Sequence, residues 1–409
     1  MAKKILVPGA GIGQVIVLKK AQEMGLTTVV VSPEGDYPGF RYADIVYHED
    51  VRNAEKVLEI ARKEKIDGIV SDQNDIPVET MGYVAEILNL TGNSYATSKI
   101  YCRKDLMREK CKEIGMPSLA YGIATDLKGT LKIAREIGFP LMCKPTNNQS
   151  SKGVFKVDNE DALLRVFDEV LANAFSGEII IEQFMEGNEY IVDGLAIEGK
   201  YKCLLVLENE NFNLKDILIP RGRTSPTSLS EDKVSELMSM DVQINTSFGL
   251  ANGMSHNEYL LNPQDDKFYL IDAAARGGGA FISSHLLPYA CGFDATEMLV
   301  RLACGEPLDI NDYPPASKAV CYICFYLEAG EILQIDGMDK IRDMECVLGI
   351  HEVNLEPGKK VMGLVDKSYR LGPILVGCDT LPELNNAKQM IKNTLVISTD
   401  KNNNAVIWE

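Results

Sequence analysis

The chain has 409 residues and a formal net charge of −17 at pH 7. That length is too great for one compact core and predicts two or three domains, while the acidic charge argues against nucleic acid or an anionic membrane as the partner. No apolar run approaches the roughly 18 residues of a membrane span. The closest pair of cysteines, Cys321 and Cys324, lacks the further ligands of a zinc site, and scattered free thiols are typical of a reducing compartment. We therefore predict a cytoplasmic protein.

The first 95 residues have the pattern of a parallel α/β domain. Apolar runs at 4–8 and 27–32 flank a glycine turn and a helical stretch at 14–24, and a strand at 66–71 followed by a helix at 78–88 repeats the pattern. In such folds ligands bind in the crevice at the carboxyl ends of the strands. That crevice is therefore a candidate for holding a substrate.

The glycine turn Gly9–Gly13 also invites a dinucleotide-binding interpretation. The third glycine of the usual pattern is replaced by Gln14, and the second strand ends at Ser32 without an acid to hold a ribose. A nicotinamide enzyme rests on this turn alone, and the alternative is a purely structural turn.

Residues 98–115 predict a helix rich in lysine and arginine, in which Lys104 is either a ligand or solvated surface. A helix at 127–137 and a buried strand at 139–143 follow, with Lys144 at the strand end. The polar loop that runs to Gly153 has hydroxyls and backbone N–H groups that can cover phosphates. Its alternative is an ordinary hairpin loop.

The strand at 178–184 carries an acid, Glu182, whose burial would be costly without a partner. The extended segment at its end presents backbone groups to a planar base, and Glu189 can accept ribose hydroxyls. Each acid could instead form a surface ion pair. Farther on, Arg221-Gly222-Arg223 is predicted as a turn that either grips one carboxylate or phosphate with both guanidinium groups or is solvated. A helix at 230–248 precedes the next strands.

The segment His256–Phe281 predicts a hairpin with two acids facing each other. If the loop takes residues 263–267, Glu258 lies opposite Asp272, and like charges so placed need a bridging cation such as Mg²⁺. Arg276 follows, and the three glycines after it allow a substrate to approach the backbone. His256 is a candidate active-site neighbour, and the alternative is a surface hairpin with solvated acids.

Beyond residue 309 the chain changes to short β runs at 319–327, 352–355, 360–365 and 373–377, closed by a helix at 381–395. This predicts a mostly β third domain with helices attached.

In this order and spacing, the residues resemble the ATP-grasp superfamily, in its carboxylate–amine ligase type. Residues 1–95 resemble the pre-ATP-grasp α/β domain and 96–308 the ATP-grasp domain, with a lid at about 118–184. Residues 309–409 are similar to the C-terminal α+β domain of biotin carboxylase, in an arrangement shared with purine-biosynthesis ATP-grasp enzymes. The resemblance implies an α/β and α+β architecture with the ATP-grasp fold at its centre.

The resemblance also implies a role for each motif residue, with ATP and Mg²⁺ as cofactors and Mn²⁺ as a substitute metal. Glu258 and Asp272 would bind the metal, and Arg276 and Lys144 would act in catalysis. The expected ATP contacts are Lys104, Lys144, Ser150, Ser151, Lys152, Gly153, Glu182, Gln183, Phe184, Met185 and Glu189. The expected substrate contacts are Arg221, Arg223, His256 and Gly278.

One residue departs from the family pattern, which commonly reads acid-x-Asn-x-Arg in the second metal strand. This chain has Ala274 in place of the asparagine, and alanine cannot ligate a metal. Two carboxylates suffice with water and phosphate oxygens, or Asn257 substitutes, or metal use is weakened.

The implied reaction is ATP-dependent ligation: a small carboxylate attacks the γ-phosphate to form an acylphosphate, and an amine then displaces phosphate. Alternatives are an ATP-binding protein with weak or no catalysis, and a carboxylase-like or purine-pathway-like enzyme. We expect small-molecule carboxylate and amine partners and, from base rates, a homodimer. The sequence identifies neither the carboxylate nor the amine.

Overall fold

The computed structural model describes residues 2–147, 153–212, 220–364 and 369–409. The chain forms two compact units: unit 1 comprises residues 1–203, 235–278 and 296–310, and unit 2 comprises 204–234, 279–295 and 311–409. The predicted fold class is confirmed, because a parallel sheet near the N-terminus is followed by antiparallel sheets. The predicted boundaries after residues 95 and 308 stay predictions.

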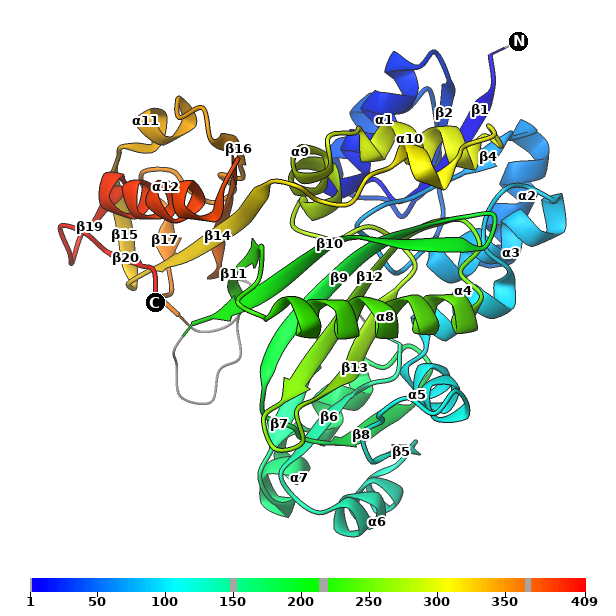
Figure 1. The fold of residues 1–409 in the computed structure, drawn as a ribbon, viewed down its shortest axis with the longest axis horizontal. Coiled ribbons are helices and arrows are strands. Elements are labelled where there is room, and N and C mark those ends of the chain that lie inside the picture. The colour runs from blue at the N-terminus through cyan, green and yellow to red at the C-terminus, as the bar shows by residue number, and fades with distance from the viewer. Residues whose placement is uncertain (1, 148–152, 213–219, 365–368) are drawn as a thin grey trace. The chain divides into compact units, whose positions relative to one another are not determined.

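Unit 1 begins with a parallel sheet in the order β3-β2-β1-β4, traced in blue in Figure 1. Leu6, Val29 and Val31 from the strands pack with Val57 and Val84 from the helices in its core. The predicted strand at 66–71 is shorter than expected. The elements are β1 (Lys4–Pro8), α1 (Ile12–Glu23), β2 (Thr27–Ser32), a 3₁₀ turn (Pro38–Tyr42), β3 (Ile45–His48), α2 (Ala54–Glu64), β4 (Gly68–Ile69) and α3 (Val78–Leu88).

The predicted single helix at 98–115 is wrong, because the chain forms α4 (Tyr95–Cys102) and α5 (Lys104–Glu113). Arg103 between them is extended, with φ −123° and ψ 111°. The backbone N–H of Lys104 donates to the carbonyl of Thr146 at 3.0 Å rather than to α4. The break therefore places Lys104 at the first position of α5.

A second, antiparallel sheet follows in the order β5-β8-β6-β7. Its core is apolar, with Leu141, Cys143, Ile179 and Ile181 of the strands packing against Phe167 of a helix. This sheet lies within the region predicted as a lid. Its elements are β5 (Tyr121–Ala124), α6 (Leu127–Ile137), β6 (Leu141–Pro145), β7 (Phe155–Val157), α7 (Glu160–Ala172) and β8 (Ile179–Gln183).

The predicted hairpin is formed by β12 (Gly253–Asn262) and β13 (Lys267–Ala274), and β9 (Asn188–Ile197) pairs with β12 on its other side. Helix α8 (Glu231–Phe248) contacts β12, where Asn257 bonds Asp241 and Asn245 of the helix. The strand β10 (Lys200–Asn211) begins in unit 1 and continues in unit 2, and α10 (Ala295–Ala303) belongs mainly to unit 1.

The hairpin pairing is confirmed, but by a different route from the one expected. The loop is one residue shorter than predicted, because Lys267 already pairs with Asn262. A register shift between Glu258 and Tyr259 then restores the predicted pair of Glu258 with Asp272. The two acids lie opposite each other because of this β-bulge, which the sequence pattern did not reveal.

Unit 2 has strands in the order β11-β14-β18-β16 and a small sheet in the order β17-β15-β19. The predicted strand at 352–355 is wrong, whereas two strands at 330–336 and 347–350 were missed. Its elements are β11 (Pro220–Ser225), a π-helical turn (Ile282–Leu286), α9 (Leu287–Cys291), a 3₁₀ turn (Ile310–Asp312), β14 (Ala319–Leu327), β15 (Gly330–Asp336), α11 (Met338–Arg342), β16 (Val347–Ile350), β17 (Lys360–Val361), β18 (Leu371–Cys378), α12 (Leu381–Thr394), β19 (Val396–Thr399) and β20 (Val406–Ile407).

Within the described residues, we find no helix with the length and hydropathy needed to cross a membrane.

Candidate functional site

A buried ion cluster joins the end of β6 to β8 and α5. The Nζ atom of Lys144 lies 2.5 Å from Oε2 of Glu182, and Nε of Arg108 donates to Oε1 of Glu182 at 2.7 Å. The side chains of Arg108 and Glu182 are each only 1% exposed. Burial alone would raise the pKa of Glu182, but attraction to Arg108 and Lys144 outweighs it and lowers the pKa to about 2. Glu182 is therefore an ionised acid with two cationic partners, which agrees with the expectation that its burial needs a partner.

Lys104 faces the second acid of the hairpin. Its Nζ atom lies 3.1 Å from both carboxylate oxygens of Asp272. Burial opposes the charge of Lys104, yet the attraction of Asp272 raises the lysine pKa overall. The alternative of a solvated surface lysine is therefore wrong.

The charges of this cluster do not cancel. Lys104, Arg108 and Lys144 supply three cations against the two carboxylates of Glu182 and Asp272, which leaves a net charge of +1 among the five groups. Burial also lowers the pKa of Lys144, and the neighbouring cations act in the same direction against the pull of Glu182. An added anion such as a phosphate would relieve this repulsion.

The hairpin brings the two predicted metal ligands together. Glu258 and Asp272 are cross-strand partners, with side chains 33% and 41% exposed. Their like charges face each other, which suits a Mg²⁺ ion that is held by one or two carboxylates and completes its shell with water and phosphate oxygens. The described residues contain no group of three or more His, Cys, Asp or Glu side chains arranged to hold a metal. Glu258 and Asp272 thus fit magnesium only if the two carboxylates are its protein ligands and water or phosphate oxygens supply the rest.

His256 joins the hairpin acids to a buried carboxylate. Its Nδ1 atom hydrogen-bonds Asp193, and its Nε2 atom lies 3.7 Å from Oε1 of Glu258. Burial would lower the pKa of His256, but Asp193 raises it above the usual value. His256 therefore lies beside one of the two predicted metal ligands, whereas its place in an active site and its contact with a substrate stay predictions.

The strand geometry rejects Asn257 as a substitute metal ligand. Its side-chain amide donates to Asp241 at 2.7 Å and to Asn245 at 3.2 Å, both on α8. Successive residues of a strand point to opposite faces, so Asn257 faces away from Glu258. Ala274 is buried and pairs with His256, on the face that carries the acids.

Arg276 is held by an acid that the sequence analysis did not identify. Its Nε and Nη2 atoms donate to the two carboxylate oxygens of Asp75 at 2.7 and 2.9 Å. Beside it, the backbone N–H of Gly277 donates to Oδ1 of Asp72 at 2.9 Å. A substrate was expected to approach the backbone here, but at Gly277 the carboxylate of Asp72 occupies that place. Gly278 is buried, and its substrate contact stays a prediction.

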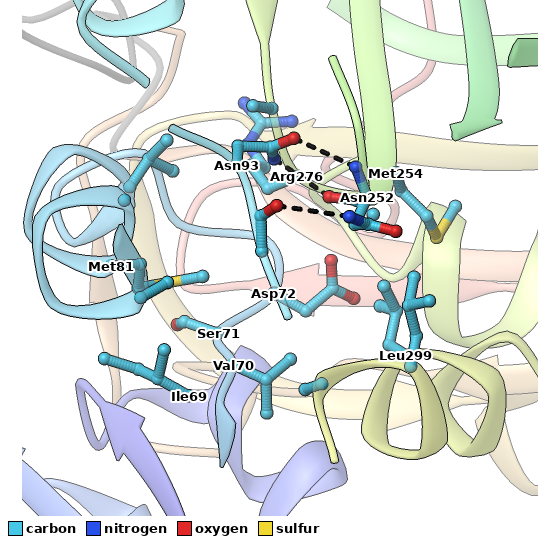
Figure 2. A pocket seen from close by; sticks show the side chains of 18 of the residues that line it. Ile69, Val70, Ser71, Asp72, Met81, Asn93, Asn252, Met254, Arg276 and Leu299 are labelled. Atoms are coloured by element: carbon cyan, nitrogen blue, oxygen red, sulfur yellow. Dashed lines mark hydrogen bonds between the residues drawn. The ribbon is translucent and has the colours of Figure 1, made fainter. Parts of the chain in front are cut away.

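A cavity of about 60 Å³ lies beside Arg276, at the carboxyl end of β4 (Figure 2). Met81, Met254 and Leu299 supply apolar walls, while Ser71 and Asp72 supply polar atoms. The Oγ atom of Ser71 is buried and has no hydrogen-bond partner. The volume is several times the roughly 10–15 Å³ that one water molecule needs. This is the crevice that the α/β pattern predicted as a substrate site.

The expected nucleotide-covering loop lies only partly within the described residues. Ser150, Ser151 and Lys152 are outside them, whereas Gly153 is buried with φ +71° and its added Cβ would lie 2.9 Å from Cβ of Asn173. Gly153 therefore serves the backbone conformation and packing. The phosphate contacts of this loop stay predictions.

The expected adenine-binding segment follows Glu182 at the end of β8. Gln183 is exposed, while Phe184, Met185 and Glu189 are half-buried. Nζ of Lys156 lies 4.4 Å from the centre of the Phe184 ring. The carboxylate of Glu182 is taken by Arg108 and Lys144. The backbone N–H groups of Gln183 and Phe184 donate to the carbonyls of Ala120 and Pro140 at 2.8 and 3.1 Å. The adenine and ribose contacts of this segment stay predictions.

The glycine turn before α1 wraps around its own glutamine. Oε1 of Gln14 accepts from the N–H of Gly11 at 3.1 Å, and Nε2 of Gln14 donates to the carbonyl of Asp72 at 2.7 Å. Gln14 is buried, and an added Cβ at Gly9 would lie 3.3 Å from Oε1 of Gln14. The side chain thus lies where a dinucleotide phosphate would approach, which supports the structural interpretation of this turn.

Arg221 and Arg223 lie in unit 2, in the strand β11 and not in the predicted turn. Gly222 is needed because an added Cβ would lie 2.5 Å from the carbonyl oxygen of Tyr322 on β14. Arg221 lies 3.5 Å from Glu210 and 3.1 Å from Glu409, measured between side-chain nitrogen and oxygen atoms. The alternative of a solvated turn is wrong, and substrate binding by this pair stays a prediction.

The sequence analysis missed Arg108, Asp75 and Asp193. Arg108 lies four residues after Lys104 in the basic helix, so its place on the same helix face was a usable signal. Asp75 and Asp193 contact residues more than 60 positions away. No local pattern reveals such partners.

The chain resembles known proteins in sequence and in fold. Residues 137–284 match the family model of the ATP-grasp domain. The carbamoyl phosphate synthase large chain of Caldanaerobacter subterraneus subsp. tengcongensis is 26% identical over 346 residues, covering 78% of this chain and 31% of that protein. The corresponding protein of Thermotoga maritima is 24% identical over 357 residues, covering 83% of this chain and 31% of its own length. The chain thus spans about a third of the length of these relatives.

Solved structures match almost the entire chain. The L-amino acid ligase from Bacillus licheniformis has a TM-score of 0.81 at 19% identity and covers 97% of this chain and 99% of its own. Phosphoribosylglycinamide synthetase from Anaerococcus prevotii has a TM-score of 0.76 at 18% identity and covers 98% and 100%. At these identities the likeness establishes the fold. The match to the ATP-grasp family model covers residues 137–284, about a third of the chain.

Proposed function

We propose that this protein is an ATP-dependent ligase that activates a small carboxylate as an acylphosphate and couples it to an amine, releasing ADP and phosphate. The observation that carries the proposal is the cross-strand pair of Glu258 and Asp272 with Lys104 on Asp272. Such a pair combines an acid clamp for a metal with a cation for phosphate oxygens.

The chain's own residues would contribute mainly charge and position. Lys104 and Lys144 would hold the phosphate groups of ATP, and the surplus positive charge of their cluster favours that anion. Glu258 and Asp272 would hold magnesium, which supplies charge neutralisation for phosphate oxygens when bound. Arg276 would steady the phosphate and the carboxylate near it.

The carboxylate and amine would bind near the cavity beside Arg276. Its walls combine apolar side chains with Ser71 and Asp72, a mixture that suits a small molecule with both apolar and polar parts. Exchange of Arg276 from Asp75 to a substrate carboxylate would keep the guanidinium paired during binding.

The decisive experiment is a screen for ADP release over amino acids and small carboxylates, each crossed with amines and ammonia. Bicarbonate belongs in the panel, because a fold neighbour, a 2-oxoglutarate carboxylase domain, was solved with that anion and MgADP. We expect ADP release that depends on one acid and one amine. Asp272→Asn should lower it by about 100-fold or more, while Asp265→Asn in the exposed hairpin turn makes the same charge change and should not. Acid-independent ADP release across the whole panel would refute the ligase.

A second candidate is an ATP-binding protein without turnover. It is favoured by Ala274, which removes the third ligand that the family commonly uses. Tight ATP binding in calorimetry, with no acid-dependent ADP release in the same panel, would support it over the ligase.

A further inference from the structure

The β-bulge in β13 decides which face Asp272 occupies. From the hairpin turn, Asn262 pairs with Lys267 and the pairing continues in step to Tyr259 with Leu270. Unbroken continuation would set Glu258 opposite Ile271 and Asn257 opposite Asp272. Since a one-residue slip moves a side chain to the other face, Asp272 would then point with Asn257 toward α8. The extra residue at the bulge turns it to the side of Glu258 instead.

β13 is the edge strand of its sheet, so carbonyls on its outer side have no neighbouring strand to bond. At the bulge one arginine bonds two carbonyls in succession: Nη1 of Arg108 donates to the carbonyl of Leu270, and Nη2 donates to the carbonyl of Ile271, both at 2.8 Å. The planar fork of a guanidinium can reach two neighbouring carbonyls at once, which a lysine ammonium cannot reproduce with the same fixed geometry.

Arg108 is itself held on its remaining side. Its Nε atom donates to Glu182 on β8, whose other carboxylate oxygen meets Lys144. Arg108 also lies one helical turn after Lys104 on α5, and residues spaced by four share a helix face. One turn of α5 thus contacts the carboxylate of Asp272 through Lys104 and the two preceding carbonyls through Arg108.

We propose that Arg108 is a positioning residue that clamps the β13 bulge and so keeps Asp272 beside Glu258 as a metal ligand. The metal part of this inference rests on the proposed function, whereas the clamp on the bulge does not. Arg108 also bonds Glu182, which pairs with Lys144, so the same arginine connects the proposed phosphate-binding lysine to the strand that carries Asp272.

Arg108→Lys is the informative variant, because it keeps a cation beside Glu182 and removes the fork. Arg103→Lys is its matched control: Arg103 precedes the same helix and ion-pairs with Glu178 at 2.8 Å, but its hydrogen bonds go to Asp105 and Glu178 and not to β13. Both variants are compared with the wild-type chain in two measurements.

The first measurement is amide hydrogen exchange over peptides spanning residues 267–276 without any ligand. We expect faster exchange in Arg108→Lys than in the wild type or Arg103→Lys. The second is the affinity for Mn²⁺ in the presence of ADP, followed by electron paramagnetic resonance. We expect Arg108→Lys to bind Mn²⁺ roughly tenfold or more weakly, with ADP affinity in EDTA changed far less.

Unchanged exchange in Arg108→Lys would overturn the clamp, and faster exchange with wild-type Mn²⁺ affinity would overturn its role for the metal. Equal losses in Arg103→Lys would also overturn the proposal, because they would indicate general loosening of α5. A wild-type chain that binds no Mn²⁺ with ADP would refute the metal role together with the proposed function, while hydrogen exchange would still decide the clamp.

Discussion

At the scale of single residues, the site is built from charges that are paired within the chain. Arg108, Glu182 and Lys144 are buried, whereas Asp272 and Asp75 are partly exposed. Glu182 meets Arg108 and Lys144, Asp272 meets Lys104, and Arg276 meets Asp75. Removing one member of a buried pair typically costs about 3–5 kcal/mol, because the other charge stays buried without a counterion. These pairs therefore serve folding as well as any chemistry.

Glu182 should make stability depend on acid pH. Its pKa of about 2 lies below the ordinary glutamate value, so its contribution is fully present above about pH 4.3 and is lost as the pH falls toward 2. The contribution is on the order of 3 kcal/mol. We expect Glu182→Gln to be less stable than wild type at pH 7 and to approach it as the pH falls.

Urea unfolding at a series of pH values measures this difference. Glu178→Gln is the control, because Glu178 is partly exposed and forms an ion pair with Arg103 at the start of β8. A gap between Glu182→Gln and wild type that stays constant from pH 7 to pH 2 would contradict the assignment.

At the scale of elements, the hairpin of β12 and β13 sets the chemistry. Its alternating strand pattern predicted two acids on one face, and the structure achieves this with a shorter loop and a bulge. The same face carries Ala274 two residues after Asp272, where the family pattern has an amide. The hairpin therefore provides both carboxylates expected of a metal site, but β13 has no side-chain ligand at position 274.

Restoring the amide should strengthen metal use. Ala274→Asn places an oxygen on the acid-bearing face of β13, so the Mg²⁺ concentration for half-maximal nucleotide-dependent stabilisation should fall by about threefold to tenfold, which corresponds to roughly 0.7–1.4 kcal/mol. Ala273→Asn offers a comparison on the opposite face, and because both alanines are buried, both variants will lose stability. An unchanged or higher magnesium requirement in Ala274→Asn would show that two carboxylates already complete the protein's share of the shell.

At the scale of the whole molecule, the chain forms two compact units, and every contact of the candidate site described above, apart from the Arg221 and Arg223 strand, lies in unit 1. A ligand that binds only the folded chain stabilises it by mass action. Nucleotide and metal should therefore act first on the unfolding of unit 1.

We expect MgATP at about 100 times its dissociation constant to stabilise unit 1 by about 2.7 kcal/mol. Thermal unfolding with ATP in excess Mg²⁺ and with ATP in EDTA separates the nucleotide part from the metal part. In Asp272→Asn the metal part should shrink, because one of the two carboxylates is gone. Identical unfolding curves in Mg²⁺ and EDTA for the wild-type chain would argue against a metal at the hairpin.

The sequence by itself determined the parallel N-terminal sheet, many of the helices and strands before residue 309, and the order of the charged residues from Lys104 to Arg276. These follow from local periodicity, glycine and proline positions, and acids set in apolar strands, all of which act over short distances. The pairing of Glu258 with Asp272 was predicted from a loop at 263–267, and the structure reaches the same pairing through a shorter loop and a bulge.

Only the tertiary structure decided how these residues are held. The break at Arg103, the bulge before Asp272, and the contacts of Arg108, Asp75 and Asp193 depend on partners distant in the chain. A bulge disrupts the hydrogen bonds between two strands, and another element must then bond the exposed backbone groups. A buried charge likewise requires a counterion from elsewhere in the fold. Such requirements are met in three dimensions, so they leave little trace in the spacing of residues.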